Sequence, residues 1–199
     1  MPIDQTTFLD QYELLECPGA NGVLIPVVKR TDGFEEDTTG VRVPDWMVLI
    51  EQSDGQSTLK GYEKHIELFG WYCESSRHVK GDSSNHLYTS GTLWHSDVFL
   101  VMQNGKHNHN INKWIAAGDI TTGVTIVRLS RVNDAIQPLQ QLRFEICHWA
   151  GMHAYLDWSI ARFTACRRSN TVFAFDQGGK SKGQTSCTTN YVDNTVVAK

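Results

Sequence analysis

Residues 91–150 decide the fold, and their centre is the sequence Asn110-Ile-Asn-Lys-Trp-Ile-Ala-Ala117. Three apolar residues have the i, i+3, i+4 spacing of one helical face: Ile111, Trp114 and Ile115. Residues suited to cap a helix flank them, namely Asn108 or Asn110 at the start and Gly118 after the end. A helix of about two turns is marginal in water, and its neighbours in the sequence have strand patterns. We therefore expect one short helix, residues 110–117, packed on a sheet through this apolar stripe.

The segments around the helix alternate between apolar and polar side chains, which is typical of half-buried strands. Expected strands cover residues 46–50, 65–72, 93–102, 125–129, 142–149, 154–166 and 171–175, with a turn at 169–170. Seven to nine short strands with one helix predict a mainly β protein. The expected fold is an antiparallel β-barrel of two packed sheets, with the short α-helix on its side.

Two of these segments predict which side chains share a face. In 65–72 one face should carry Ile66, Leu68 and Tyr72, and the other His65, Glu67, Phe69 and Trp71. In 142–149 one face should carry Leu142, Phe144, Ile146 and His148, and the other Arg143, Glu145, Cys147 and Trp149. Because both faces of the first segment carry apolar or aromatic residues, the outer face is expected to need a partner.

Two segments stand apart from the strands. Residues 1–44 read as an N-terminal extension or arm, with a possible short helix at 7–15 and an edge strand at 22–28 that Pro26 interrupts. The barrel domain is then expected at 45–199. Residues 74–91 form the longest polar segment, and polar loops of that length in compact domains are usually functional or disordered. Its polar residues include Arg77, His78, Lys80 and Asp82.

Composition excludes several classes of function. The chain has 199 residues, 40% of them hydrophobic, and a net charge of −4, so nucleic acid is an unfavourable partner. The N-terminus lacks the pattern of a signal peptide, and no apolar run is long enough to cross a membrane, so cytoplasmic synthesis without membrane insertion is expected. The cysteines are odd in number and scattered, which favours reduced thiols: Cys17, Cys73, Cys147, Cys166 and Cys187.

Catalytic and metal-binding patterns are weak in this sequence. His107 and His109 have a metal-like spacing in an expected loop, but no H-E-x-x-H or C-x-x-C motif supplies further ligands. Neighbouring Cys147 and His148 would point to opposite faces of a strand, and a nucleophile elbow and a complete P-loop are both lacking. We therefore expect no enzyme, no cofactor and no metal.

The order of elements from about residue 45 to 193 resembles the haemolysin-coregulated protein (Hcp) family, which forms the tube of bacterial type VI secretion systems. The segment His65-Ile-Glu-Leu-Phe-Gly-Trp-Tyr72 is similar to that family's "I-E-V-L-S-W-S-W-G" strand. His95-Ser-Asp97-Val-Phe99 resembles its "V-Q-D-x-x-F-T-K" strand, although "F-T-K" is Phe99-Leu-Val here. The short helix ending at Gly118 and the strand Val124-Thr-Ile-Val-Arg128 are similar to its helix and "A-T-L-V-x-R" strand.

This resemblance implies a structural function in a bacterium. Subunits would form hexameric rings that stack into a hollow tube, with contractile sheath, spike and luminal effector proteins as partners. The protein would assemble in the cytoplasm and then be secreted without a signal peptide. Candidate assembly residues are Arg77, His78, Lys80, Asp82, Phe69, Trp71, Arg143 and Glu145. The alternatives are a monomeric β-barrel that binds a small ligand, a metal-dependent enzyme that uses the histidines, or a specialised Hcp-like paralogue or secreted effector.

Overall fold

The computed structural model describes residues 12–18, 24–30, 44–81, 87–132, 135–176, 178–193 and 195–198. The N-terminal strands are β1 (Tyr12–Pro18) and β2 (Leu24–Arg30), followed by β3 (Trp46–Ile50) and β4 (Ile66–Tyr72). The central elements are β5 (Ser75–Gly81), β6 (Leu87–His95), β7 (Val98–Gln103), α2 (His107–Ala117) and β8 (Ile120–Val132). The C-terminal strands are β9 (Ala135–Ala154), β10 (Trp158–Phe175), β11 (Ser181–Asn190) and β12 (Thr195–Ala198).

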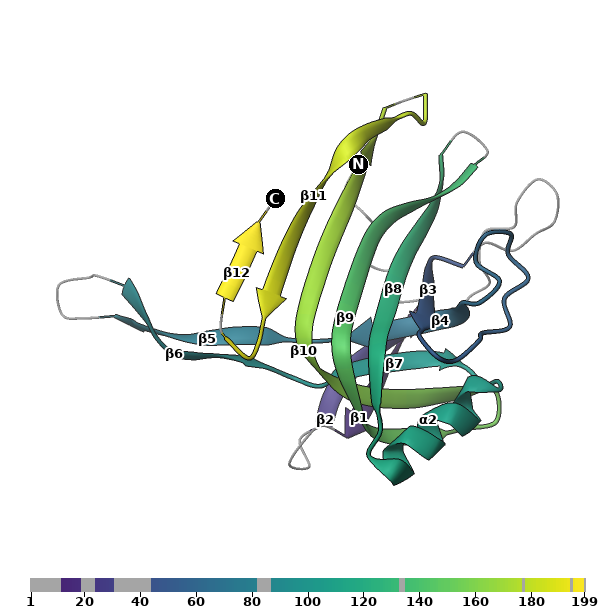
Figure 1. The fold of residues 1–199 in the computed structure, drawn as a ribbon, viewed down its shortest axis with the longest axis horizontal. Coiled ribbons are helices and arrows are strands. Elements are labelled where there is room, and N and C mark those ends of the chain that lie inside the picture. Colours follow the sequence, from purple (N-terminus) through teal and green to yellow (C-terminus); the bar gives the residue numbers. More distant parts are fainter. Residues whose placement is uncertain are drawn as a thin grey trace.

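An antiparallel barrel forms the centre of the molecule (Figure 1). Its strands follow the order β10-β7-β4-β3-β8-β9, and pairing between β9 and β10 closes it. Apolar side chains fill the interior, among them Val48, Leu100, Ile126, Phe144 and Phe163, each exposed by 1% or less. The expected closed antiparallel barrel with one short helix is therefore confirmed.

Long strands carry the sheet beyond the barrel, where β9, β10, β11 and β12 lie side by side (Figure 1). The expected turn at 169–170 is wrong, because β10 continues through it. Asn170 pairs with Leu142 of β9 on one side and with Cys187 of β11 on the other. Pairing on both sides outweighs the local turn preference of a Ser-Asn pair.

Helix α2 begins at His107, earlier than the expected start at 110. Its N-cap is Lys106, with no side-chain capping bond, so the expected asparagine cap is wrong. The Asn108 amide instead donates to Asn104 Oδ1 at 2.8 Å, and the Asn110 amide to Ser53 Oγ at 3.0 Å. The helix ends as predicted at Gly118, whose φ of 70° is left-handed.

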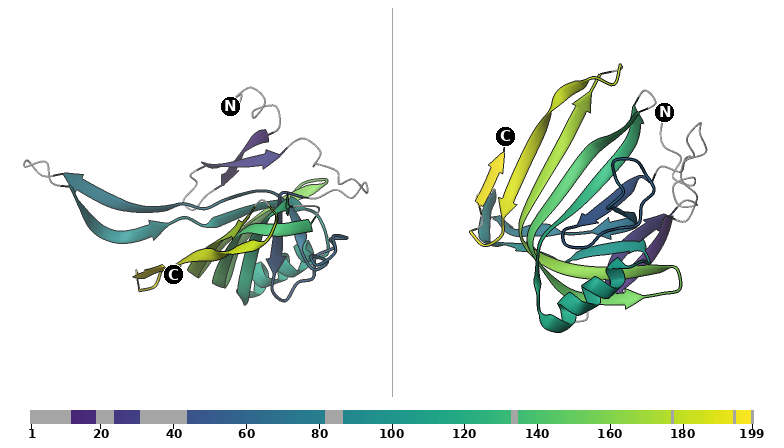
Figure 2. Two further views of the ribbon diagram at one scale, coloured as in Figure 1. Left: turned by 90° about the horizontal axis from the view of Figure 1, so that it is seen from above. Right: turned by 45° about the vertical axis from the view of Figure 1, so that its right-hand side comes forward.

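The polar segment 74–91 is not a loop without secondary structure. Strands β5 and β6 pair antiparallel and form a long hairpin that extends away from the barrel (Figures 1 and 2). We call this hairpin, residues 75–95, the arm. The expected single strand 93–102 is correspondingly two strands, because β6 ends at His95 and β7 starts at Val98.

The N-terminal strands β1 and β2 form a separate antiparallel hairpin. The expected helix at 7–15 is wrong for residues 12–15, which belong to β1, while 7–11 lie outside the described residues. Within the expected edge strand at 22–28, residues 24–28 belong to β2, in which Pro26 pairs with Glu16. Strand β2 lies against β4 and β7 on the outside of the barrel (Figure 2).

Candidate interaction surfaces

Helix α2 packs on the barrel through the apolar stripe seen in the sequence. Ile111 is fully buried, Trp114 is 8% exposed, and Ile115 is half-buried against the same core. The ring of Trp114 stacks on Trp149 of β9, with centroids 6.0 Å apart. The indole N–H of Trp149 donates to Thr121 Oγ1 at 3.1 Å, which satisfies its polar atom inside the core.

A register shift in β4 changes the faces that the alternation predicted. The pairing with β7 slips between Leu68 and Gly70, which is the signature of a β-bulge. Trp71 therefore joins Leu68 on the core side and meets Trp46 edge-on, with centroids 5.5 Å apart. Phe69 and Trp71, expected together on the outer face, are on opposite sides of the sheet.

The outer apolar face of β4, β7 and β10 packs within this chain. Its cluster, here the outer cluster, consists of Phe69, Tyr72, Phe99, Val101, Trp158 and Ile160. Strand β2 lies across β4 and β7 on the outside of the barrel (Figure 2). Strand β2 therefore covers part of the face on which a partner subunit was expected, and the role of this face in assembly stays a prediction.

A second interruption of the alternation between the two sheet faces occurs in β9 at Ile146. This residue has a φ of 56°, in the left-handed region that β-branched residues rarely adopt. Beyond it, Cys147 and Trp149 lie in the same core as Phe144, while the Ile146 side chain is about half exposed. The predicted grouping of Cys147 and Trp149 with Arg143 is wrong for this reason. Burial raises the pKa of the Cys147 thiol to about 12, so it stays protonated and unreactive.

A chain of alternating charges crosses the polar face of the long strands. Arg143 contacts Glu51 at 2.8 Å and Glu145 at 3.3 Å, and Arg167 contacts Glu145 at 3.2 Å. The hydroxyl of Thr122 donates to Glu51 at 2.5 Å, and this bond together with Arg143 lowers the pKa of Glu51. The predicted pair Arg143 and Glu145 thus lies in one network, which we call the charge ladder. Glu51 and Arg167 were not singled out from the sequence.

The arm is fixed firmly at its base. Glu74 N–H donates to Ser96 Oγ at 2.9 Å, and Ser96 N–H donates to the Glu74 carbonyl at 3.0 Å. The ring of His95 lies 3.8 Å from that of Tyr191, which follows β11. Among the charges predicted in this segment, Arg77 lies exposed on β5, which also carries His78 and Lys80, while Asp82 lies outside the described residues. The arm therefore projects from a rigid base.

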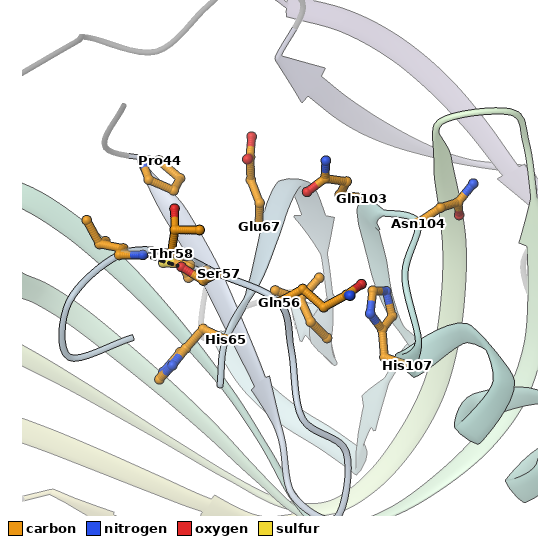
Figure 3. Close-up of a pocket in the computed structure, with 12 residues that line it drawn as sticks. Pro44, Gln56, Ser57, Thr58, His65, Glu67, Gln103, Asn104 and His107 are labelled. Carbon is orange, nitrogen blue, oxygen red and sulfur yellow. Dashed lines mark hydrogen bonds between the residues drawn. The ribbon is translucent and has the colours of Figure 1, made fainter. Parts of the chain in front are cut away.

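A cavity of about 180 Å³ lies between the loop after β3, the strands β3, β4 and β7, and the start of α2 (Figure 3). His107 lines it and is only 2% exposed, so the expectation of a solvated loop histidine is wrong. Neither ring nitrogen of His107 has a hydrogen-bond partner, and Nδ1 of His65, also at the cavity, lacks one as well. Burial lowers the pKa of both imidazoles. The Gln103 backbone acts in the opposite direction and favours a higher pKa of His107, although it does not form a hydrogen bond with the ring.

The sequence contained a signal for the burial of His107 that the motif analysis missed. His107, Ile111 and Trp114 recur at i, i+4 and i+7, so they share the helical face that meets the barrel. The structure separates His107 from its neighbour in the motif, because His109 is exposed. In the described part of the chain, no three His, Cys, Asp or Glu side chains gather as metal ligands.

No family model matches the sequence, and neither does any curated protein. Solved structures do match the fold. The chain is similar to a structure described as that of a type six secretion system protein, with a TM-score of 0.69 and 13% identity over 78% of this chain and all of the other. It is similar to Hcp1 from Salmonella typhimurium, with a TM-score of 0.59 and 12% identity over 77% of this chain and 98% of the other.

A third similar structure is described as a type VI secretion system effector from Yersinia pestis, with a TM-score of 0.54 and 15% identity. That match covers 73% of this chain and 99% of the other. At these identities the likeness establishes the fold. Within the described residues, no helix has the length and apolar character that crossing a membrane requires.

Proposed function

The chain has the Hcp fold, and we propose from it that the protein is a structural subunit of a type VI secretion tube. Subunits would associate into hexameric rings, and the rings would stack into a hollow tube that carries effector proteins. The observation that carries this proposal is the extent of the match, because this chain covers 100% and 98% of the first two secretion-system structures described above. Contractile sheath and spike proteins are the further partners of such a tube.

The free sheet edge supports an edge-to-edge ring contact. Strand β12 pairs with β11 on one side, and its other side has no strand partner within the described residues. All four of its residues are exposed, including Val196 at 59% and Val197 at 53%. Exposed edges are usually blocked or paired with another chain. A neighbouring subunit that pairs with β12 would continue the sheet around a ring.

The arm supports contact between rings. It extends far beyond the barrel (Figures 1 and 2) and is fixed at its base by the paired bonds of Glu74 and Ser96. An isolated two-stranded hairpin is only marginally stable in water, and the contacts of Glu74 and Ser96 fix the arm only at its base. Docking on a neighbouring ring would give its exposed strands a second surface.

Light scattering coupled to size-exclusion chromatography tests the ring. We expect a mass six times the 22.4 kDa of one chain, and native mass spectrometry should give the same stoichiometry. A monomer at all accessible concentrations would contradict the proposal and favour the alternative of a monomeric ligand-binding barrel.

Removal of the arm separates rings from tubes. Replacement of residues 76–94 by a short flexible linker should leave the barrel folded and the rings intact, while tubes disappear from negative-stain images. The control is Arg77→Ala, which removes one exposed charge and keeps the hairpin. Tubes that still formed without the arm would refute its assignment to stacking.

A specialised paralogue or secreted effector is the second candidate. The Yersinia pestis structure is described as an effector and shares the barrel. The N-terminal hairpin β1–β2 adds a sheet separate from the barrel sheet. Secretion from a bacterium with an active type VI system, without incorporation into its tubes, would favour this candidate over the tube subunit. In either case the protein would leave the cytoplasm after folding there.

A further inference from the structure

The cavity beside α2 contains a buried polar side chain without a partner. His107 is 2% exposed, and both of its ring nitrogens lack a hydrogen-bond partner (Figure 3). An unmet buried donor or acceptor costs about 1–3 kcal/mol. Proteins rarely keep such a group unless water or a ligand satisfies it. The position is also tightly built, because a Cβ on Gly105 would lie 2.9 Å from Cε1 of His107.

The polar groups around His107 are held in place by the loop across the cavity mouth. The Lys106 N–H lies 3.4 Å from Gln56 Oε1, which orients the side-chain amide at the cavity. Gly55 N–H donates to the Lys64 carbonyl at 2.8 Å, and Ser57 N–H donates to the His65 carbonyl at 3.2 Å. The loop therefore presents Gln56 and Ser57 from a fixed backbone rather than a mobile one.

The cavity wall has two chemical sides. Met47, Leu59 and Ile66 contribute apolar surface and are each 5% exposed or less. Gln56, Gln103 and the two imidazoles contribute neutral hydrogen-bonding groups, and Glu67 contributes a carboxylate that can accept hydrogen bonds from hydroxyl groups. Because burial lowers the pKa of both histidines, each ring is neutral and offers one donor and one acceptor at neutral pH. Among the described lining residues none is lysine or arginine, so an anion has no counter-charge there.

We propose that this cavity binds a small neutral polyhydroxylated molecule of about monosaccharide size, with His107 as its central hydrogen-bonding residue. Its volume of about 180 Å³ is below the ~300–1,000 Å³ of drug-sized sites and equals about six water molecules. Hydroxyl groups both donate and accept, which matches neutral imidazoles and amides. The C–H face of a sugar ring matches the apolar wall. The inference does not depend on tube formation, because the cavity lies within one chain.

The experiment uses the full chain and four probes: glucose, galactose, N-acetylglucosamine and glycerol. Saturation-transfer NMR detects binding, and the imidazole nitrogens of His107 report its location in long-range ¹H–¹⁵N spectra. We expect at least one probe to bind with a Kd on the order of 1 mM and to shift the His107 nitrogens. The matched variants are His107→Phe, which keeps an aromatic ring without nitrogens, and His109→Phe on the exposed side of the same helix.

His107→Phe should weaken binding at least tenfold, while His109→Phe should bind as the wild type does. If His107→Phe fails to fold, Gln56→Leu on the exposed loop should also weaken binding and replaces it in the test. Two results would overturn the proposal. One is that no probe shifts the His107 nitrogens at concentrations about tenfold above 1 mM, which would make the cavity a water site. The other is unchanged affinity in folded His107→Phe.

Discussion

Truncation of Trp114 should remove much of the free energy that holds α2 on the barrel. The side chain is 92% buried, as its 8% exposure implies, and its ring stacks on Trp149 at 6.0 Å. Loss of this burial should destabilise the fold by about 3–5 kcal/mol when the tryptophan becomes alanine. For a chain of about 200 residues, 1 kcal/mol shifts the Tm by about 2–4 °C. Trp114→Ala should therefore lower the Tm by about 6–20 °C.

Thermal unfolding followed by far-UV circular dichroism measures this change in Tm, and urea unfolding measures the corresponding free energy. All variants need the same protein concentration, since association would otherwise add to the apparent stability. The matched control is Trp94→Ala, the same substitution at a side chain that is 54% exposed, and it should cost well under half as much. Equal losses from the two variants would show that the helix is not held by burial of Trp114.

Local contacts lead to three further expected outcomes. Burial lowers the pKa of His107 below the ordinary 6.5, so the chain takes up a proton when it unfolds at lower pH. The free energy of unfolding should therefore fall as the pH drops below about 6.5, by up to about 1.4 kcal/mol per pH unit. In urea titrations at pH 5–8, His107→Phe should make this pH dependence shallower. A Cβ on Gly123 would lie 2.8 Å from Glu51 Oε1. Gly123→Ala should therefore displace the Glu51 carboxylate from Arg143 and cost about 1 kcal/mol in the wild type. In a Glu51→Ala background the same substitution should be neutral or stabilising, and denaturation of the four variants measures this difference. The Asn104 amide donates an exposed hydrogen bond to the Tyr155 carbonyl at 2.6 Å, so Asn104→Ala should cost about 0.5–1.5 kcal/mol and speed amide hydrogen exchange at the β9–β10 turn.

The alternation of side chains was enough to predict the barrel strands and the helix. Residues 46–50 and the stripe from Ile111 to Ile115 lie where the periodicity places them, because burial on one face leaves its period in the sequence. The polar arm left no such trace. Its strands pair through their backbones, and their polar sequence carries no apolar alternation, so composition predicted a loop where the chain forms a hairpin.

Changes of phase are the part of the fold that alternation cannot supply. Residues 142–149 alternate without interruption in the sequence, yet a φ of 56° at Ile146 moves Cys147 and Trp149 into the core. A left-handed conformation costs an ordinary residue about 1–2 kcal/mol, so local preference argues against it. Only packing of the whole barrel selects it. The bulge between Leu68 and Gly70 has the same character, and it separates Phe69 from Trp71.

The packing seen in the structure changes which side chains could take part in contacts between subunits. The alternation placed apolar side chains on an outer face that a neighbouring subunit would bury. In the structure strand β2 lies against β4 and β7 of the outer cluster, and Leu59 and Tyr62 from the loop after β3 pack on Met47 and Val127. Among the described residues, the surface left for a ring contact includes the backbone of the β12 edge, exposed apolar side chains such as Val196 and Val197, and half-exposed charges such as Arg167. Exposed ion pairs contribute only about 0–1 kcal/mol each and are screened over about 10 Å at 0.1 M salt, whereas backbone pairing carries no net charge to screen. A ring built on this fold would therefore draw its stability from strand pairing and from burial of apolar side chains such as Val196 and Val197, and the charge ladder would set which registers of that pairing are allowed.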